Sequence, residues 1–229
     1  MGLRLLRNGA RTIVCLVGVL AGMSVAEAAT LKVGGTGAAL GGMKLLATAY
    51  AQDHPDVQIE VLPSLGSGGG IKALLAGAID IAVSARPLKD KERAAGAVDR
   101  AYARSPLVLA TRNDNATDSV SVAELEGMYS GHLAEWPDGR TVRLIVRPPS
   151  ETDIKLLRSL SPGMAEAVDM AIERPGLVSA TDDQENAAML EELPGSLGAI
   201  SLGQVLSENR DLKLLSVDGV VPSVALAAD

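Results

Sequence analysis

Residues 64–88 read SLGSGGGIKALLAGAIDIAVSARPL, and this stretch decides the fold. Its pattern predicts a loop of glycine and serine, a short apolar helix, and a buried strand from Ile79 to Val83. Glycine backbone can adopt positive φ angles and approach a ligand closely. The first amides of a helix lack intrahelical acceptors and carry part of the positive end of the helix dipole. The stretch is therefore typical of an anion-binding turn, to which the hydroxyls of Ser64 and Ser67 add donors.

A sharp turn between a strand and a helix also uses glycine for its backbone freedom alone, so this loop does not by itself indicate a ligand. A second loop of the same kind favours one, because Gly34-Gly35-Thr36-Gly37 follows an apolar strand that begins at Leu31. A helical pattern then begins at Gly41, and an alternating strand runs from Val57 to Leu62. The order strand, glycine loop, helix, found twice, predicts an α/β fold with parallel strands.

Three loops are expected to meet at the carboxyl edge of this parallel sheet, where ligands of α/β folds bind. Each loop offers backbone N–H groups, to which a hydroxyl or a guanidinium can add hydrogen bonds. The loops carry Thr36 and Gly37, Ser67 and Gly68, and Ser84 and Arg86.

The rest of the chain continues the alternation of helices and strands. Residues 102–111 predict a long strand that Pro106 interrupts, and this is the expected crossing between two domains. A strand at residues 194–200 is expected to return the chain to the first domain. Helices are further expected around residues 89–97, 121–129, 150–160, 164–172 and 183–190, and strands at 141–146 and 212–217.

A possible third helix start lies in the run Arg147-Pro148-Pro149-Ser150-Glu151-Thr152-Asp153. Ser150 with Asp153 three residues later is a capping-box pattern, which requires no more than a well-capped helix. In the functional alternative, Ser150 and Thr152 donate hydroxyls to an anion and Arg147 supplies a fixed cation. Glu151 counts against that alternative, because a carboxylate beside a bound anion is repulsive.

Residues 1–28 are typical of a secretory signal peptide. Three arginines precede the uncharged run 12–23, and Ala26-Glu27-Ala28 is a small-x-small cleavage pattern. The run is shorter than the ~20 apolar residues that a membrane anchor needs. We expect cleavage near Ala28. The single cysteine, Cys15, lies inside this segment, so the mature chain is expected to form no disulfide and no cysteine-metal site.

Composition excludes several classes of partner. The 229 residues are 47% hydrophobic but contain no Phe and only 2% aromatics, so the core must be aliphatic. Without residues 1–28, which contain three arginines and Glu27, the net charge is about −9. Such a chain lacks the basic, stacking surface of nucleic-acid binders and has no long-range attraction for anionic lipid. If it binds an anion, local dipoles must hold it.

An enzyme is not expected. His54 and His132 are the two histidines, and both lie in segments that predict exposed turns. No Gly-x-Ser-x-Gly elbow occurs, and the loop at Gly66 lacks the Gly-Lys-Ser/Thr ending of a nucleotide-binding loop. We therefore expect no catalytic residue, no cofactor and no metal.

Five segments resemble the phosphate-type periplasmic substrate-binding proteins of ABC transporters. They are residues 66–74, 80–88, 131–136, 194–200 and 217–223, and the first two carry the likeness most strongly. The resemblance implies a type II periplasmic-binding-protein fold: an α/β fold with two lobes, each a mostly parallel sheet flanked by helices, joined by two crossing strands. The implied first lobe is residues 29–110 plus 200–229, and the second is residues 111–199.

The resemblance also implies a function and a site. A small oxyanion, in first place phosphate, would bind between the lobes of a periplasmic monomer and pass to an inner-membrane permease. Arg86 or Arg147 would supply positive charge. The ligand-binding residues expected on these grounds are Thr36, Gly37, Ser67, Gly68, Ser84, Arg86, Arg147, Ser150 and Thr152.

Two departures from the family pattern keep alternatives open. Pro148-Pro149 and Glu151 stand where phosphate binders have small residues and glycine, which leaves sulfate, molybdate and tungstate as other ligands. Similar proteins also continue past residues 220–223 with a strand and a helix, whereas this sequence stops at Asp229. The expectation is a shortened variant of the fold or a truncated reading frame. The alternative function is a sensor or adaptor that uses the same fold without a ligand.

Overall fold

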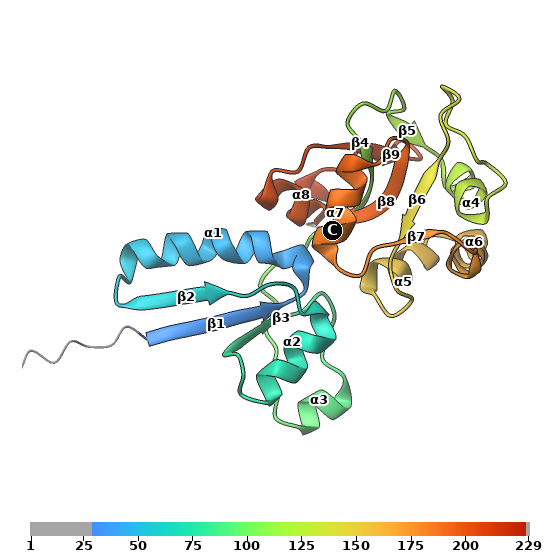
Figure 1. Ribbon diagram of the computed structural model, residues 1–229. Coiled ribbons are helices and arrows are strands. Elements are labelled where there is room, and N and C mark those ends of the chain that lie inside the picture. The colour runs from blue at the N-terminus through green and yellow to red at the C-terminus, as the bar shows by residue number, and fades with distance from the viewer. Residues whose placement is uncertain (1–28, 228–229) are drawn as a thin grey trace, which may run out of the picture.

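The computed structural model describes residues 29–227, so the expected signal peptide, its cleavage site and Cys15 lie outside the described residues. In the part described, no helix is long and apolar enough to cross a membrane. The elements, shown in Figure 1, are β1 (Ala29–Gly35), α1 (Gly37–Asp53), β2 (Val57–Val61), α2 (Gly66–Leu75), β3 (Ile81–Val83), α3 (Asp90–Ala94), β4 (Leu107–Arg112), β5 (Ser119–Val120), α4 (Val122–Ser130), β6 (Arg143–Val146), α5 (Thr152–Arg158), α6 (Pro162–Glu173), β7 (Val178–Ser179), α7 (Asp183–Glu192), β8 (Ser196–Ser201), α8 (Leu202–Glu208), β9 (Leu212–Val217) and the 3₁₀ helix η1 (Val224–Ala227).

The N-terminal lobe, residues 29–104, is built on a three-stranded sheet in the order β2-β1-β3. Both pairings are parallel, as the order of elements predicts, with Val33 opposite Val61 and Gly35 opposite Val83. The chain moves from β1 to one neighbour and then back past β1 to the other. Right-handed crossovers in opposite directions place helices on opposite faces, and α1 and α2 indeed lie on opposite sides of the sheet (Figure 1).

Two glycines of the first lobe are required by close packing. A Cβ on Gly70 would lie 2.6 Å from the Cα of Gly35, so α2 rests directly on the end of β1. Gly35 has a φ of 142°, and a Cβ there would lie 1.9 Å from the carbonyl oxygen of Val83. Backbone packing therefore accounts for part of the glycine content of these loops, without any ligand.

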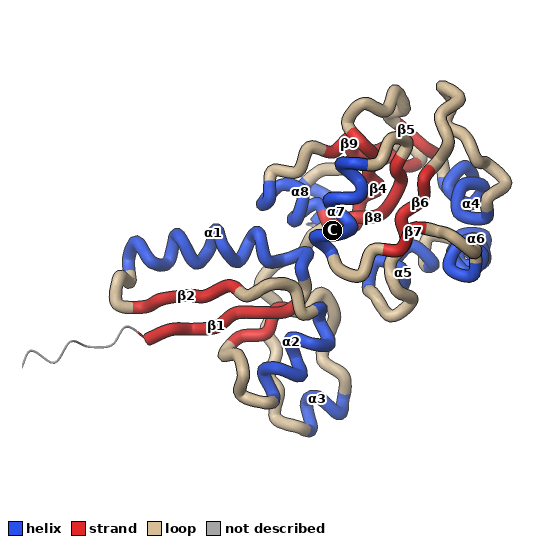
Figure 2. Tube along the Cα trace, in the orientation of Figure 1, coloured by secondary structure: helices blue, strands red, loops and turns tan. Residues whose placement is uncertain are grey.

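The C-terminal lobe is built on a six-stranded mixed sheet in the order β5-β9-β4-β8-β6-β7, which Figure 2 shows apart from the first sheet. Strand β4 is antiparallel to both β8 and β9, and β6 is parallel to β7 and β8. One buried cluster packs α4, α5 and α6 against one face, with Trp136 and Tyr129 among its members. A second cluster packs α7 and α8 against the other face through Leu190 and Leu202. The predicted two-lobed α/β fold is confirmed.

The last strand is placed differently from expectation. Residues 200–229 were expected in the first lobe, but β9 pairs with β4, Leu215 lying opposite Leu109, and the fully buried Leu215 belongs to the core of the second lobe. Helix α8 does touch the first lobe, because it packs along α1. A Cβ on Gly41 of α1 would lie 2.5 Å from the hydroxyl of Ser207 in α8, which shows how close that contact is.

The two chain crossings between the lobes lie side by side. The N–H of Leu202 donates to the carbonyl of Pro106 at 3.0 Å, just before β4 and just after β8. The hydroxyl oxygens of Ser105 and Ser201 are 2.8 Å apart, and the N–H of Gly203 donates to Ser105 Oγ at 2.8 Å. The predicted crossings at Pro106 and at the end of the 194–200 strand therefore form one junction.

Candidate anion site between the lobes

Helix α1 begins without the usual means of satisfying its first amides. Its N-cap is Thr36, which is buried and makes no side-chain capping bond, and its first turn contains no acidic residue. The carboxylate of Asp183, on α7 of the other lobe, supplies the missing acceptor. Asp183 Oδ2 accepts from the N–H of Ala38 at 2.9 Å and from Thr36 Oγ1 at 3.3 Å. The α1 N-terminus is thus occupied by a negatively charged side chain of the protein itself.

Arg147 faces the same carboxylate from the end of β6. Its Nη1 donates to Asp183 Oδ1 at 3.1 Å, and its Nη2 lies 3.7 Å from a Glu151 oxygen. The residue is only 4% exposed, and its Nε has no hydrogen-bond partner among the described residues. A buried guanidinium with an unused N–H can donate a hydrogen bond to a further acceptor group.

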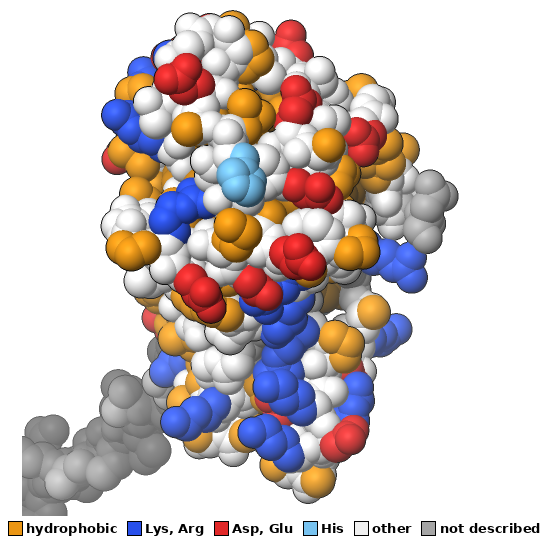
Figure 3. Space-filling view, turned by 90° about the vertical axis from the view of Figure 1, so that its right-hand side faces the viewer, with side chains coloured by type: hydrophobic (Ala, Val, Ile, Leu, Met, Phe, Trp, Pro, Cys, Tyr) orange, Lys and Arg blue, Asp and Glu red, His pale blue; other side chains and the backbone are white. Residues whose placement is uncertain are grey.

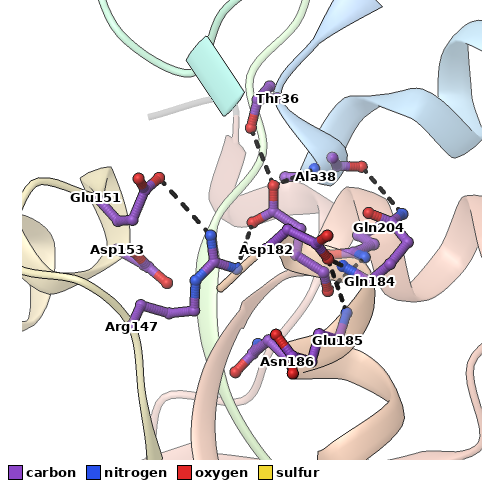
Figure 4. Close-up of polar contacts among 12 residues, drawn as sticks. Thr36, Ala38, Arg147, Glu151, Asp153, Asp182, Gln184, Glu185, Asn186 and Gln204 are labelled. Atoms are coloured by element: carbon purple, nitrogen blue, oxygen red, sulfur yellow. Dashed lines mark hydrogen bonds and ion pairs between the residues drawn. The ribbon is translucent and has the colours of Figure 1, made fainter. Parts of the chain in front are cut away.

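Negative charge is in excess around Arg147. Besides Asp183 and Glu151, the carboxyl group of Asp153 lies close by (Figure 4). Burial raises the pKa of Asp153, the positive charge of Arg147 opposes this rise, and the negative charges of Asp183 and Glu151 add to it. Three carboxyl groups thus surround one guanidinium. An anion that enters the site is attracted by Arg147 and repelled by the carboxylates.

Ser67 and Ser84 lie together at the carboxyl edge of the first sheet. Ser67 Oγ accepts from the N–H of Ala85 at 3.0 Å. Ser84 Oγ donates to the carbonyl of Arg86 at 2.8 Å and accepts from its N–H at 3.2 Å, so it closes a local turn. The edge is shared with Thr36, whose N–H donates to the carbonyl next to Ser84, that of Val83. In the described chain no acceptor is assigned to the Ser67 hydroxyl proton, which remains available.

The N-terminus of α2 is also uncapped. The helix begins at Gly66 after Leu65, which makes no side-chain capping bond, and no acidic residue lies in its first turn. Gly68 is exposed, and nothing lies within 4 Å of the position that a Cβ would take there. Packing therefore does not require a glycine at this position, in contrast to Gly35 and Gly70. The first amides of α2 form a second positive helix end at the sheet edge that holds Thr36.

The comparisons with known proteins fit this architecture. The PBP superfamily domain matches residues 24–228. The chain belongs to the PBP superfamily. The resemblance on which the sequence analysis relied is therefore confirmed at the level of the family.

Two curated relatives of this PBP superfamily member are named for phosphate. Phosphate-binding protein PstS 2 of Streptococcus pneumoniae is 36% identical over 94 residues, which are 41% of this chain and 32% of that protein. Phosphate-binding protein PstS of Staphylococcus aureus is 30% identical over 96 residues, which are 39% of this chain and 29% of that protein. The chain thus aligns with about a third of the length of these relatives.

Solved structures show the same fold. A phosphate ABC transporter substrate-binding protein with bound phosphate, from Clostridium perfringens, superposes with a TM-score of 0.69 at 20% identity and covers 85% of this chain and 78% of its own. A phosphate-binding protein from Stenotrophomonas maltophilia gives a TM-score of 0.57 at 16% identity, with coverages of 85% and 66%. At these identities the likeness establishes the PBP fold, and none of the four proteins named here is named as an enzyme.

Arg86 does not serve as an anion-binding cation in this PBP superfamily member. Its guanidinium forms two hydrogen bonds with the carboxylate of Glu92, at 2.7 and 2.9 Å, and a third with the carbonyl of Pro87. The bond from Arg86, followed by that from the N–H of Lys89, lowers the pKa of Glu92 from 4.5 to about 2. The expectation that Arg86 holds a ligand is therefore wrong for this geometry: the pair fixes α3 to the end of β3.

Neither hydroxyl expected after Arg147, that of Ser150 or that of Thr152 at the start of α5, forms a side-chain hydrogen bond within residues 29–227. Ser150 is exposed. The predicted capping box is wrong, because α5 begins at Thr152 with Glu151 as an N-cap that makes no side-chain bond. The cause is Asp153, which is turned inward towards Arg147 and accepts only from the N–H of Ile154. Arg147 is linked to the α1 N-terminus through the carboxylate of Asp183.

Asp183 is the residue of this candidate site that the sequence analysis missed. The helix expected at residues 183–190 is capped by its neighbour Asp182, whose Oδ1 accepts from the N–H groups of Gln184 and Glu185 at 2.9 Å. One carboxylate is enough for that cap. The second aspartate of the pair was therefore free for another partner, and this was the signal present in the sequence.

The histidines lie outside the site, in exposed positions as predicted. The ring of His54 stacks on that of Tyr50 with centroids 4.1 Å apart, and His132 Nδ1 is 3.0 Å from Ser130 Oγ. Between residues 29 and 227, no three His, Cys, Asp or Glu side chains are grouped to hold a metal ion. Neither histidine contacts Thr36, Ser67 or Arg147.

Proposed function

We propose that this chain is a solute-binding protein that captures phosphate between its two lobes and delivers it to a membrane permease of an ABC transporter. The protein would act as a monomer in the periplasm after loss of residues 1–28. The observation that carries the proposal is that the N-termini of α1 and α2, neither capped by a side chain of its own helix, lie at one sheet edge, and that the α1 end shares an anionic partner, Asp183, with the buried Arg147. The names of the relatives from Streptococcus pneumoniae and Clostridium perfringens support phosphate as the anion.

The donors at this edge suit a tetrahedral oxyanion. On the side of the first lobe they are the first amides of α1 and α2 and the hydroxyls of Thr36 and Ser67. The guanidinium of Arg147, at the end of β6, is the donor on the side of the second lobe. A hydrogen bond to a charged group contributes about 1.5–3 kcal/mol, so several converging donors are enough for micromolar affinity. The ligand is bound and released unchanged, because nothing near these donors is arranged to break a bond.

The overall charge makes this local arrangement necessary. A net charge of about −9 on the mature chain repels a divalent anion at long range. Short-range donors at helix ends act within the first turn, where solvent screening is weak. We therefore expect binding to depend on individual donors, with little help from long-range steering.

The first test is a thermal-shift screen of the purified chain with phosphate, sulfate, molybdate and tungstate. A ligand present at a hundred times its Kd stabilises the folded state by about 2.7 kcal/mol through mass action. Phosphate is expected to raise the unfolding midpoint. If another oxyanion raises the unfolding midpoint and phosphate does not, that oxyanion is the ligand and the proposal of phosphate is wrong.

The second test is Ser67→Ala. Loss of its hydroxyl is expected to weaken phosphate binding about tenfold by calorimetry, because a donor to a charged oxygen is lost. The matched control is Ser159→Ala at the end of α5, whose hydroxyl donates to the carbonyl of Leu156 and lies outside the site. If Ser67→Ala binds phosphate with unchanged affinity, the N-terminus of α2 is not part of the binding site.

One observation favours a second candidate function. Asp183 already fills the α1 N-terminus, and Glu151 lies beside Arg147, so a sensor or adaptor without any oxyanion ligand would need no change to this site. The screen separates the two, because no shift with any of the four oxyanions favours the ligand-free adaptor.

A further inference from the structure

We propose that Asp183 is a built-in competitor of the ligand: its carboxylate occupies the α1 N-terminus and Arg147, and an oxyanion gains these donors only when that carboxylate moves away. The inference rests on the proposed function, because it assumes that an anion enters this site. It assigns to one residue of the second lobe the task of setting the affinity.

The geometry identifies the carboxylate as a substitute for a ligand. Its two oxygens accept from three kinds of donor: the N–H of Ala38, the hydroxyl of Thr36 and the guanidinium of Arg147, at 2.9, 3.3 and 3.1 Å. The first two donors belong to the N-terminal lobe and the third to the C-terminal lobe. A bound oxyanion would need the same donors, and two anions in one small site repel each other strongly.

The surrounding side chains form a built site. Arg147 is 4% exposed and Thr36 is 7% exposed. Arg147 Nε has no partner among residues 29–227, so the guanidinium retains capacity beyond Asp183. The side chain of Asp183 is 19% exposed, so its carboxylate has a route towards solvent when an anion replaces it.

Asp183 is not needed for its own helix. Asp182 caps α7 by accepting from the N–H groups of Gln184 and Glu185. The side-chain bonds of Asp183 all go to residues outside α7, namely Thr36, Ala38 and Arg147. Loss of the Asp183 charge therefore leaves the α7 cap in place. The two adjacent aspartates have different tasks, which provides a matched control one residue away.

The consequence for affinity follows from tethering. A competitor on the same chain has a high effective concentration at the site, so the measured affinity for a free anion falls below the intrinsic affinity of the donors. Asp183→Asn keeps the shape and one acceptor oxygen but removes the charge that Arg147 holds. Asp183→Ala removes both. Each variant is expected to bind phosphate about tenfold more tightly than the unmodified chain.

Calorimetry with inorganic phosphate on the full chain tests the proposal, with Asp182→Asn as control. Asparagine is as good an N-cap as aspartate, so this control changes the net charge equally without touching the site, and it should match the unmodified chain. Tighter binding by Asp183→Asn and Asp183→Ala alone supports the competitor. Equal or weaker binding by both overturns it, because Asp183 then has no effect or helps to hold the ligand. No phosphate binding by any of the four proteins overturns the proposed function and, with it, this inference.

Discussion

The two lobes differ in how much apolar surface they bury and in charge. The N-terminal lobe buries six apolar side chains, namely Val33, Leu40, Ile71, Ile79, Val83 and Ala97, whereas twenty-six are buried beyond residue 106. Residues 29–104 contain nine basic and seven acidic residues, and residues 105–229 contain nine and twenty. In Figure 3, Lys and Arg side chains gather on the lower part of the face, where α2 and α3 lie, and Asp and Glu are spread over the upper part.

This difference indicates that the first lobe depends on the second. A sheet of three strands with few buried side chains gains little from its own hydrophobic burial. It gains from packing α1 against α7 and α8, and from the attraction between a slightly positive lobe and a strongly negative one. The proposed anion site lies at this contact, so the proposed binding would use residues that also hold the two lobes together.

The largest expected effect tests whether the second lobe carries most of the stability. Trp136 is 2% exposed, and its indole N–H donates to the carbonyl of Gly195 at 3.0 Å. Trp136→Ala should lower the free energy of unfolding by about 3–5 kcal/mol, because it leaves a cavity and an unpaired carbonyl. Urea denaturation followed by circular dichroism measures this.

The control in the other lobe is Val98→Ala, a substitution at an exposed side chain, since Val98 is 90% exposed. It should change the free energy of unfolding by no more than about 0.5 kcal/mol. Hydrogen exchange should also show faster opening of the three-stranded sheet than of the six-stranded one in the unmodified chain. The reverse order of exchange would contradict the comparison of the lobes.

The next effect concerns the contact between the lobes. A Cβ on Gly37 would lie 2.3 Å from Gln184 Oε1 and 2.8 Å from the Cβ of Asp183. Gly37→Ala should therefore push α1 from α7 and lower stability by about 1–3 kcal/mol, as overpacking does.

Gly42, in the same helix, provides a control of opposite sign. Nothing lies within 4 Å of its Cβ position, so Gly42→Ala should raise stability by about 0.5–1 kcal/mol through helix propensity. Thermal unfolding of both variants makes the measurement. A stabilising Gly37→Ala would show that the α1–α7 contact does not hold the lobes together.

The smallest effect lies in the N-terminal lobe and depends on pH. The folded-state pKa of Glu92 is about 2, below its ordinary value of 4.5, because Arg86 and the N–H of Lys89 bind the carboxylate. The pair therefore contributes its stability fully above pH 4.5 and loses it as the pH falls through 2. Glu92→Gln should lower the urea midpoint at pH 7 and reduce this loss between pH 4.5 and 2. Parallel curves for the two proteins would exclude a role for the pair.

Local patterns predicted most of the elements. The alternation of residues 57–62 and the apolar run at 79–83 became β2 and β3, and the parallel order followed from the helices between them. The helix expected at residues 121–129 begins with a Ser121–Glu124 capping box, whose two partners lie in one helical turn. Strands, helices and caps of this kind depend on residues close together in the sequence, so the spacing of residue types is enough to predict them.

The errors concern contacts that local spacing does not determine. Asp183 contacts Thr36, which lies 147 residues away in the sequence. Strand β9 pairs with β4, and Leu215 of β9 is buried in the core of the second lobe. The Ser150 capping box failed because burial beside Arg147 turned Asp153 inward. Arg86 was the avoidable error, because Glu92 lies only six residues away and its charge was visible in the sequence.

The two chain crossings between the lobes meet at Ser105 and Ser201, so a rotation of one lobe relative to the other is expected to have its axis near these two serines. Hinges of this kind turn about a few residues at the ends of elements. Gln204, three residues after Ser201, donates to the backbone carbonyl of Asp183 at 3.1 Å, so an angular change at the serines is passed on to Asp183. We expect residues at this axis, which never touch the anion, to change its rate of release.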